Sequence, residues 1–167
     1  MKHPELNKLT KVNTFVFDVD GVLTDGSILV TEHGDQLRSM NIKDGYALQY
    51  AVKQNYNVII ISGGDSEGVR KRLERLGVKE IHLGVKDKTS LLQQICTSND
   101  ISLDSCLYMG DDLPDLHVMD LCAVKSCPRD AVSEIQAIAD IVSQMPGGRG
   151  AVRDIIEKTL TVQGKWH

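Results

Sequence analysis

The chain has 167 residues and a net charge of −4, and 41% of its residues are hydrophobic. This composition is typical of a soluble globular protein, and the negative charge argues against a dedicated nucleic-acid-binding protein. No apolar run approaches the ~20 residues that a membrane-spanning helix needs. We expect a single domain over residues 1–167, located in the cytoplasm, with neither a nucleic-acid nor a membrane partner.

The first third of the chain predicts a strand, a hairpin and a helix. Thr14–Val19 is rich in β-branched and aromatic residues, which favours a strand. Ser27–Ile42 contains two β-prone stretches around the turn-like cluster Glu32–Asp35, and we predict a β-hairpin over about residues 26–42. A helical pattern follows at Tyr46–Gln54.

The middle of the chain alternates strands with helices. Val58–Ile61 is apolar throughout, as the buried strands of parallel sheets are. Glu67–Leu76 has a helical pattern that ends at a glycine, a common C-terminal stop. Glu80–Leu83 predicts another strand, and Lys88–Thr97 carries leucine and isoleucine at helical spacing.

The last third continues the alternation. Cys106–Met109, Leu121–Val124 and Ala139–Val142 predict strands, and Gly150–Leu160 predicts a helix before the C-terminal residues. Strands that alternate with helices indicate an α/β fold, here a doubly wound, mostly parallel sheet with helices on both faces and the hairpin inserted after the first strand.

The cysteines and histidines carry no metal-binding pattern. The four cysteines do not form a Cys-x-x-Cys pair, and Cys106 and Cys122 lie in apolar stretches. We expect buried, reduced thiols and structural or surface histidines. No pattern indicates a role for Trp166 or His167.

The densest group of acidic residues directly follows the first predicted strand. Asp18 and Asp20 are two residues apart in the run Asp-Val-Asp-Gly-Val-Leu-Thr-Asp, which ends at Asp25. Like charges in a partly buried site repel each other, so such a pair is costly unless it has a use. Polar residues that merely begin a loop are the alternative explanation.

A second acidic group, Gly110-Asp111-Asp112-Leu-Pro-Asp115, follows the strand predicted at Cys106–Met109. Taken alone, it could equally be an acidic turn that caps a helix. In open α/β sheets, however, sites form at the carboxyl ends of the strands, and both acidic groups are predicted to lie there.

Two further polar features are predicted at the same edge of the sheet. Ser62 and Gly63 directly follow Val58–Ile61, and Lys88 lies a few residues beyond Glu80–Leu83. Four polar features at four strand ends would therefore converge on one crevice.

These residue types suit the transfer of a phosphoryl group. Crowded carboxylates need a cation, and oxygen ligands suit Mg²⁺. Asp18 could attack phosphorus to form an aspartyl phosphate, and Asp20 could serve as general acid and then general base. Lys88 and Ser62 could stabilise charge on the phosphoryl oxygens.

With these motifs in this order, the chain resembles the haloacid dehalogenase superfamily of phosphatases. The resemblance implies that Asp18 is the nucleophile and a magnesium ligand, and that Asp20 is the general acid/base and binds the metal through its backbone carbonyl. It also implies that Asp111 completes the protein ligands. Residues expected to support the site are Gly63, Asp112 and Asp115.

The chain is most similar to a capless branch of that superfamily, whose members hydrolyse 3-deoxy-D-manno-octulosonate 8-phosphate. The resemblance rests on the short length, the hairpin in place of a cap domain, Lys43-Asp44-Gly45, and the Gly-Gly-Arg-Gly sequence that opens the tail at about 147–167. It implies a role in lipopolysaccharide sugar biosynthesis. It further implies a homotetramer whose hairpins pair around a central axis, with a neighbouring subunit closing each active site.

The chain also departs from that branch. Many members have arginine where this chain has Gly64 and Lys43, and lysine cannot reproduce a bidentate arginine–carboxylate contact. Arg72 matches an arginine used across the subunit interface in related enzymes. The candidates for substrate recognition, each equally consistent with a solvated surface charge, are Lys43, Arg72, Arg75 and Arg149.

Four other functions are alternatives to this interpretation. The first is the removal of phosphate from nine-carbon sugar-acid 9-phosphates, but enzymes with that sister activity favour glutamate at the position of Gly64. A broader sugar phosphatase is a second alternative among enzymes. A phospho-acceptor receiver domain would carry its acceptor aspartate after the third strand rather than the first. A catalytically idle scaffold subunit is disfavoured because every position that the chemistry needs is filled.

Overall fold

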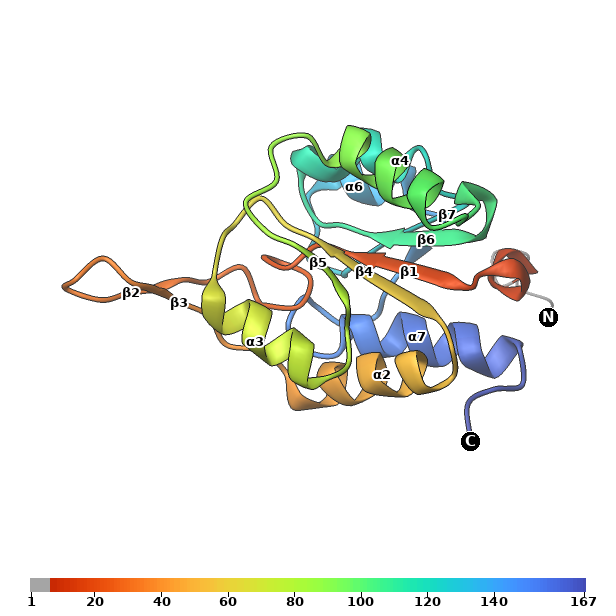
Figure 1. The fold of residues 1–167 in the computed structure, drawn as a ribbon, viewed down its shortest axis with the longest axis horizontal. Helices are drawn as coiled ribbons and strands as arrows, with labels where there is room; N and C mark the ends of the chain where they lie inside the picture. The colour runs from red at the N-terminus through yellow and green to blue at the C-terminus, as the bar shows by residue number, and fades with distance from the viewer. Residues whose placement is uncertain (1–6) are drawn as a thin grey trace.

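The computed structural model describes residues 7–167 and has three layers, with a parallel sheet between two layers of helices (Figure 1). The sheet has the strand order β5-β4-β1-β6-β7-β8, and every neighbouring pair is parallel. Its strands are β1 (Thr14–Phe17), β4 (Asn57–Ile61), β5 (Glu80–His82), β6 (Cys106–Met109), β7 (Val124–Cys127) and β8 (Ile141–Val142).

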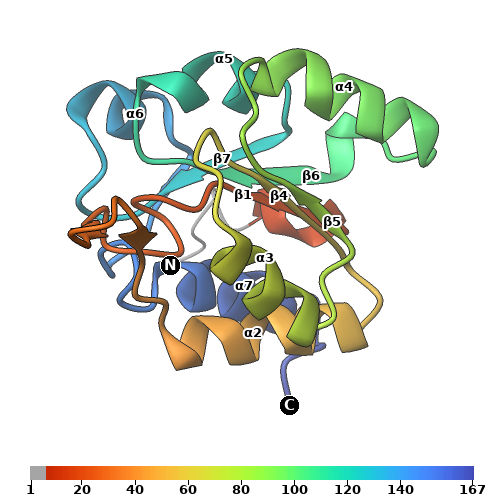
Figure 2. The same ribbon diagram turned by 60° about the vertical axis from the view of Figure 1, so that its left-hand side comes forward.

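Helices cover both faces of this sheet, as the two views show (Figures 1 and 2). One face carries α2 (Ile42–Lys53), α3 (Glu67–Arg75) and α7 (Ala151–Val162). The other face carries α4 (Lys88–Ser98), α5 (Leu116–Met119) and α6 (Ser133–Ile138). Three short 3₁₀ helices complete the described elements: η1 (Lys8–Lys11), η2 (Leu103–Ser105) and η3 (Leu113–Asp115).

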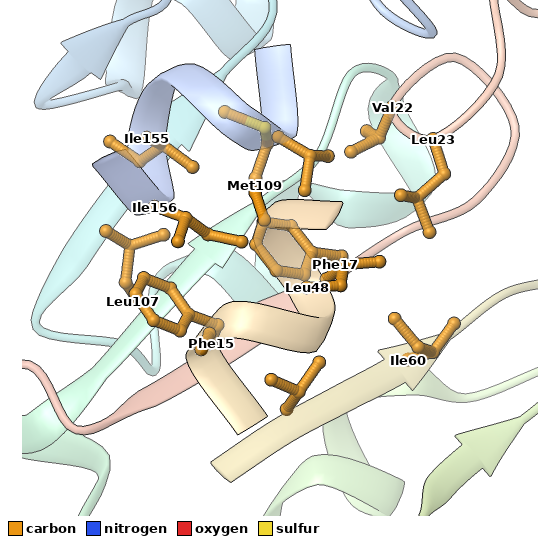
Figure 3. Packing of buried hydrophobic residues seen from close by; sticks show 14 of the residues in the cluster. Phe15, Phe17, Val22, Leu23, Leu48, Ile60, Leu107, Met109, Ile155 and Ile156 are labelled. Atoms are coloured by element: carbon orange, nitrogen blue, oxygen red, sulfur yellow. The ribbon is translucent and has the colours of Figure 1, made fainter. Parts of the chain in front are cut away.

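The strand β1 lies at the centre and is buried on both faces. Successive side chains of a strand point to opposite faces, so Phe15 and Phe17 pack toward α2 and α7 while Val16 packs toward α4. Figure 3 shows the two phenylalanines beside Leu48 of α2 and Ile156 of α7. The doubly wound α/β fold predicted from the sequence is confirmed.

The predicted hairpin is also confirmed. Its strands β2 (Leu29–Val30) and β3 (Gln36–Leu37) pair antiparallel, and the backbone N–H of Thr31 donates to the carbonyl of Asp35 across the turn. The hairpin projects from the side of the sheet at which β1 ends, and in Figure 2 it comes toward the viewer.

Two elements have boundaries that differ from the prediction by three residues or more. The strand expected at Leu121–Val124 is wrong, because the chain turns there and β7 begins only at Val124. The strand contains Ser126, a polar residue whose buried hydroxyl donates to the carbonyl of Tyr108 at 3.1 Å, so hydropathy alone does not locate it. The first helix begins at Ile42, four residues before the predicted start, because Asn41 caps it.

The four cysteines are buried and free, as expected from the sequence. Burial raises the pKa of the Cys96 and Cys127 thiols to about 12 and about 11, which keeps both in the neutral, unreactive form. Among residues 7–167, no helix is both long and apolar enough to cross a membrane.

Candidate active site

The polar residues predicted at four strand ends meet in one pocket at the carboxyl edge of the sheet. Asp18 follows β1, and its neighbours in the sheet carry Ser62 after β4 and Asp111 after β6. This catalytic pocket has a volume of about 540 Å³. It is lined by Asp18, Asp20, Gly26, Ser62, Gly63, Gly64, Val85, Lys86, Lys88, Asp111, Asp112, Pro114 and Asp115.

The loop after β1 is shaped by its own backbone. The N–H groups of Leu23 and Thr24 both donate to the carbonyl of Val19, which forms a tight turn directly beyond the strand. Gly21 has φ +85°, and a Cβ at this position would lie 1.9 Å from the Asp111 carboxylate. Glycine is therefore required here both for the backbone conformation and for the close approach of a carboxylate.

Lys88 is the first residue of α4 and reaches into the pocket as a nearly buried ammonium group. The N-cap of this helix is Asp87, whose carboxylate accepts from the backbone N–H of Ser90. The Lys88 Nζ lies 3.1 Å from Asp18 Oδ1 and 2.7 Å from Asp115 Oδ1, and its side chain is 6% exposed. One cation thus joins the two buried carboxylates.

The Asp115 carboxylate accepts hydrogen bonds from three donors. Besides Lys88, it accepts from the Tyr108 hydroxyl at 2.8 Å and from the backbone N–H of Asp111 at 3.1 Å. The tyrosine lies within β6, and no sequence pattern predicted its part in the pocket. The signal that could have found it is that a buried tyrosine hydroxyl usually has a hydrogen-bond partner. Asp115 therefore positions Lys88 and the Asp111 turn rather than offering a free oxygen to the pocket.

Burial and mutual repulsion raise the pKa of two carboxylates. The pKa of Asp18 is raised to about 7 by burial and by Asp115, against the opposing effect of Lys88. The pKa of Asp111 is raised to about 8 by burial, by Asp18 and by Asp115. Burial alone would lower the pKa of Lys88, but Asp18 and Asp115 outweigh it and raise the pKa. The pocket is thus electrostatically incomplete, because its carboxylates outnumber its cations.

The residues fit a divalent cation. One carboxylate oxygen from each of Asp18, Asp111 and Asp115 lies within 4.8 Å of the others, although Asp115 already accepts from its three donors. Asp111 Oδ1 is buried and has no hydrogen-bond partner among the described residues, which is costly for a carboxylate oxygen. An all-oxygen donor set suits Mg²⁺, and a cation held by Asp18 and Asp111 would relieve both the repulsion and the unpartnered oxygen.

Asp20 is held by an arginine that the sequence analysis did not identify. Arg38, directly after β3, places Nε 2.7 Å from Asp20 Oδ1 and Nη2 3.0 Å from Asp20 Oδ2. Two parallel contacts of this kind form a bidentate ion pair. No local pattern marks Arg38, because the pair joins the hairpin to a loop 18 residues earlier.

Ser62 and Gly64 complete the floor of the pocket on the side of β4. Ser62 is buried, and its Oγ accepts from the backbone N–H of Gly64 at 3.2 Å. The hydroxyl proton remains available for a ligand.

The four candidates for substrate recognition do not line the catalytic pocket. Lys43 and Arg149 line a second pocket of about 630 Å³, together with Asp25. Arg72 is half-buried beside Gly45, where a Cβ would lie 2.7 Å from its Nη2, and Arg75 is exposed near the end of α3.

The glycine-rich segment at residues 147–150 packs against the loop after β1. A Cβ on Gly147 would lie 1.9 Å from the carbonyl oxygen of Gly21, and one on Gly148 would lie 2.5 Å from the backbone N of Asp25. The Gly148 N–H donates to the carbonyl of Val22. This segment therefore supports the catalytic loop from behind through direct backbone contact.

Asp44 connects the same segment to α2. Its carboxylate accepts from the backbone N–H groups of Gly150, at 3.1 Å, and Arg153, at 2.8 Å, so it caps α7 from another helix. Beyond α7 the chain folds back, and the Trp166 ring lies 4.7 Å from that of Tyr50. The motifs Lys43-Asp44-Gly45 and Gly147–Gly150 are therefore in contact, although the sequence analysis treated them separately.

Comparison with known proteins gives consistent relatives. No family model matches the chain. Over 160 residues, the chain is 33% identical to the 3-deoxy-D-manno-octulosonate 8-phosphate phosphatase of Salmonella typhi, and the match covers 96% of this chain and 85% of that protein.

Solved structures show the same likeness. The 3-deoxy-D-manno-octulosonate 8-phosphate phosphatase from Moraxella catarrhalis, in complex with a magnesium ion, a phosphate ion and a KDO molecule, matches with a TM-score of 0.95 and 30% identity, over 99% of this chain and 95% of that one. A structure from Legionella pneumophila, described as a HAD superfamily (subfamily III A) hydrolase, matches with a TM-score of 0.93 and 34% identity, over 96% and 88% of the two chains.

Proposed function

The chain belongs to the family of 3-deoxy-D-manno-octulosonate 8-phosphate phosphatases, and on that premise we propose that it hydrolyses this sugar-acid phosphate to 3-deoxy-D-manno-octulosonate and phosphate. The resemblance to the haloacid dehalogenase superfamily is thereby confirmed. The reaction supplies a sugar acid for lipopolysaccharide. The nine-carbon sugar-acid phosphate and the receiver-domain alternative are not favoured by these relatives.

One observation carries the proposal for the mechanism: Asp18 lies at the end of the central strand with its Oδ1 3.1 Å from Lys88 Nζ, in a pocket whose carboxylates outnumber its basic side chains. A carboxylate in this position attacks phosphorus and forms an aspartyl phosphate. As the bond between phosphorus and the sugar oxygen breaks, Asp20 gives its proton to that oxygen. Asp20 then removes a proton from water, which hydrolyses the aspartyl phosphate and regenerates Asp18.

The remaining residues of the pocket bind and neutralise the phosphoryl group. Lys88 balances charge on the phosphoryl oxygens, and the Ser62 hydroxyl donates a hydrogen bond to them. Gly63 and Asp112 shape the rim, and Asp115 holds Lys88 in place. Magnesium, when bound by Asp18, Asp111 and the backbone carbonyl of Asp20, offsets the repulsion between the nucleophile and the phosphate.

Recognition of the sugar acid is assigned to basic residues around the pocket. Lys43 and Arg149 line a pocket that shares the loop after β1 with the catalytic pocket, so both can reach the substrate beyond its phosphate. Arg72 and Arg75 lie on α3 away from both pockets, and they contribute to the active site of a neighbouring subunit.

We propose a cytoplasmic homotetramer in which the hairpins of neighbouring subunits pair. The hairpin exposes four large apolar side chains, with exposed fractions between 41% and 68%, a cluster that marks an interaction surface. These residues are Ile28, Leu29, Val30 and Leu37.

Steady-state phosphate release with Mg²⁺ tests the function. We expect turnover of the eight-carbon 8-phosphate in preference to the nine-carbon 9-phosphate, and a loss of about 10⁴-fold or more in Asp18→Asn. Asp104→Asn, an exposed aspartate on η2, is the matched control and should keep its activity. A preference for the nine-carbon compound would keep the mechanism and change the substrate. If neither compound releases phosphate in a magnesium-dependent reaction, the phosphatase function is contradicted.

A further inference from the structure

Arg38 makes contact with Asp20 through the whole of its guanidinium group. Nε and Nη2 bind the two carboxylate oxygens of Asp20, and Nη1 donates to the backbone carbonyl of Gln36 at 3.1 Å. All three nitrogens therefore have partners, and the side chain is only 4% exposed. A planar donor group with partners on each nitrogen fixes both its own plane and that of the carboxylate it binds.

A side chain at position 64 would displace the atoms of this ion pair. A Cβ on Gly64 would lie 2.8 Å from Asp20 Oδ2 and 2.9 Å from Arg38 Nη2, closer than real Cβ atoms approach other atoms. Gly64 does not have positive φ, so its backbone conformation does not require glycine. Space for the ion pair is therefore the structural reason for glycine here.

Arg38 acts on the pocket only through Asp20. The pocket lining includes Asp20 and Gly64 but not Arg38, which approaches the carboxylate from the hairpin. The Asp20 side chain is 31% exposed, so one side of its carboxylate still faces the pocket while the other is held. A proton donor must lie within hydrogen-bond reach of the leaving oxygen, and a displacement of 1 Å can cost about 10²-fold in rate.

We propose that Arg38 is a positioning residue for Asp20 and that Gly64 is the residue that makes room for it. The inference rests on the proposed function, because it assigns Arg38 a part in the same reaction. The hairpin thereby contributes to catalysis within its own chain, in addition to any contact it makes with another subunit.

Two substrates with different leaving groups test the proposal. The sugar-acid phosphate releases an alkoxide, which needs a proton from Asp20, whereas p-nitrophenyl phosphate releases a phenolate that leaves without one. In Arg38→Gln we expect kcat/KM, which covers the steps up to departure of the leaving group, to fall about 10- to 100-fold for the sugar-acid phosphate and to change less than about threefold for p-nitrophenyl phosphate. Hydrolysis of the aspartyl phosphate, in which Asp20 acts as the base, is common to both substrates and affects kcat alone. Arg38→Lys keeps the positive charge but cannot form the bidentate contact, so its kcat/KM on the sugar-acid phosphate should lie between those of Arg38→Gln and the parent protein.

Gly64→Ala should reproduce the pattern of Arg38→Gln without removing the arginine. Gly68→Ala is its matched control, because a Cβ there meets only the Ser66 hydroxyl at 3.9 Å. Arg70→Gln controls for the loss of an arginine, since Arg70 donates to the carbonyl of Ile81 away from the pocket. Thermal melting of each variant identifies any that fail to fold, and the Arg38→Lys variant keeps the test decisive if one does.

Two outcomes would overturn the inference alone. Equal losses of kcat/KM on both substrates would assign Arg38 a structural role in holding the hairpin, and a higher kcat/KM in Arg38→Gln would mean that the ion pair withholds Asp20 from the substrate. If the parent protein hydrolyses neither substrate, the proposed function fails and the inference fails with it.

Discussion

The catalytic pocket and the hairpin differ in how firmly the chain itself holds them. In the pocket, Lys88 is nearly buried and bridges two carboxylates. The backbone N–H of Asp18 donates to the carbonyl of Met109 on the neighbouring strand β6. Each strand of the hairpin has only two residues, and Leu29, Val30 and Leu37 are more than half exposed. The polar groups of the pocket are thus held together within one chain, whereas the apolar surface of the hairpin remains exposed on that chain.

The largest effect on stability is expected from replacing Lys88 in the pocket. In Lys88→Met we expect kcat/KM to fall about 10²- to 10³-fold, because charge on the phosphoryl oxygens loses its partner. The free energy of unfolding should fall by about 3–5 kcal/mol, since two carboxylates would be buried without their cation. Steady-state kinetics and urea unfolding measure both. The exposed Lys79→Met is the control, and an equal loss there would contradict the assignment.

The pH dependence of stability tests the raised pKa values of Asp18 and Asp111 in the absence of metal. Without metal, we expect the free energy of unfolding to fall as pH rises from about 4 to about 8, because the folded protein binds protons at Asp18 and Asp111 more tightly than the unfolded chain. The slope approaches ~1.4 kcal/mol per pH unit for each group. Urea unfolding in a chelator across this range measures it. Stability that rises with pH would contradict the raised pKa values.

Magnesium should reverse this dependence. Because the cation needs both carboxylates ionised, its stabilising effect should grow with pH and reach about 2.7 kcal/mol at a hundredfold excess over its dissociation constant. Asp111→Asn should abolish the shift in melting temperature on adding Mg²⁺. Asp112→Asn, whose exposed carboxylate accepts from the backbone N–H of Leu113, should retain most of it. A full shift in Asp111→Asn would exclude that residue as a ligand.

An intermediate effect is expected at the start of α7, which the Asp44 carboxylate caps. Asp44→Ala would leave the backbone N–H groups of Gly150 and Arg153 without their acceptor, and we expect a loss of about 1–2 kcal/mol in the free energy of unfolding. Chemical unfolding measures it beside Asp104→Ala, an exposed aspartate on η2. Equal stability of the two variants would mean that water replaces the cap.

The smallest effect on the folded chain is expected at the hairpin. Leu29 and Leu37 are paired across it, and replacing both with glutamate should change the free energy of unfolding of a single chain by less than about 0.5 kcal/mol. The same double substitution should dissociate the oligomer, as sedimentation velocity would show, and lower the activity. Val162→Glu, an exposed position on α7, is the control. An unchanged sedimentation coefficient in the double variant would contradict pairing through the hairpin.

The sequence predicted the sheet and the position of the pocket because both follow from local patterns. The strands before Asp18, Ser62 and Asp111 are continuously apolar, and the ends of parallel strands meet at one edge. The same reasoning misplaced β7, because Ser126 is buried with a backbone partner and interrupts the apolar run. It also began α2 too late, at Tyr46, although Gly45 lies inside the helix that Asn41 caps.

What the sequence could not indicate depends on contacts between distant segments. Arg38 is one charged residue among several in its stretch, and only the fold brings it to Asp20. Asp44 is likewise an ordinary first-turn acidic residue of α2 until α7 packs beside it. Local propensity holds no information on such pairs, because they are fixed only when the helices and the hairpin have packed.

The glycine-rich segment that supports the catalytic loop has a consequence for how the protein is made. The side chain of Asn41 contacts the Gly148 carbonyl across 107 residues of chain, and Gly147 lies against the backbone of Gly21. A growing polypeptide leaves the ribosome from its N-terminus, so the loop that carries Asp18 emerges long before the segment that braces it. A nascent chain that still holds Gly148 inside the ribosome therefore presents the loop that carries Asp18 without the segment that braces it.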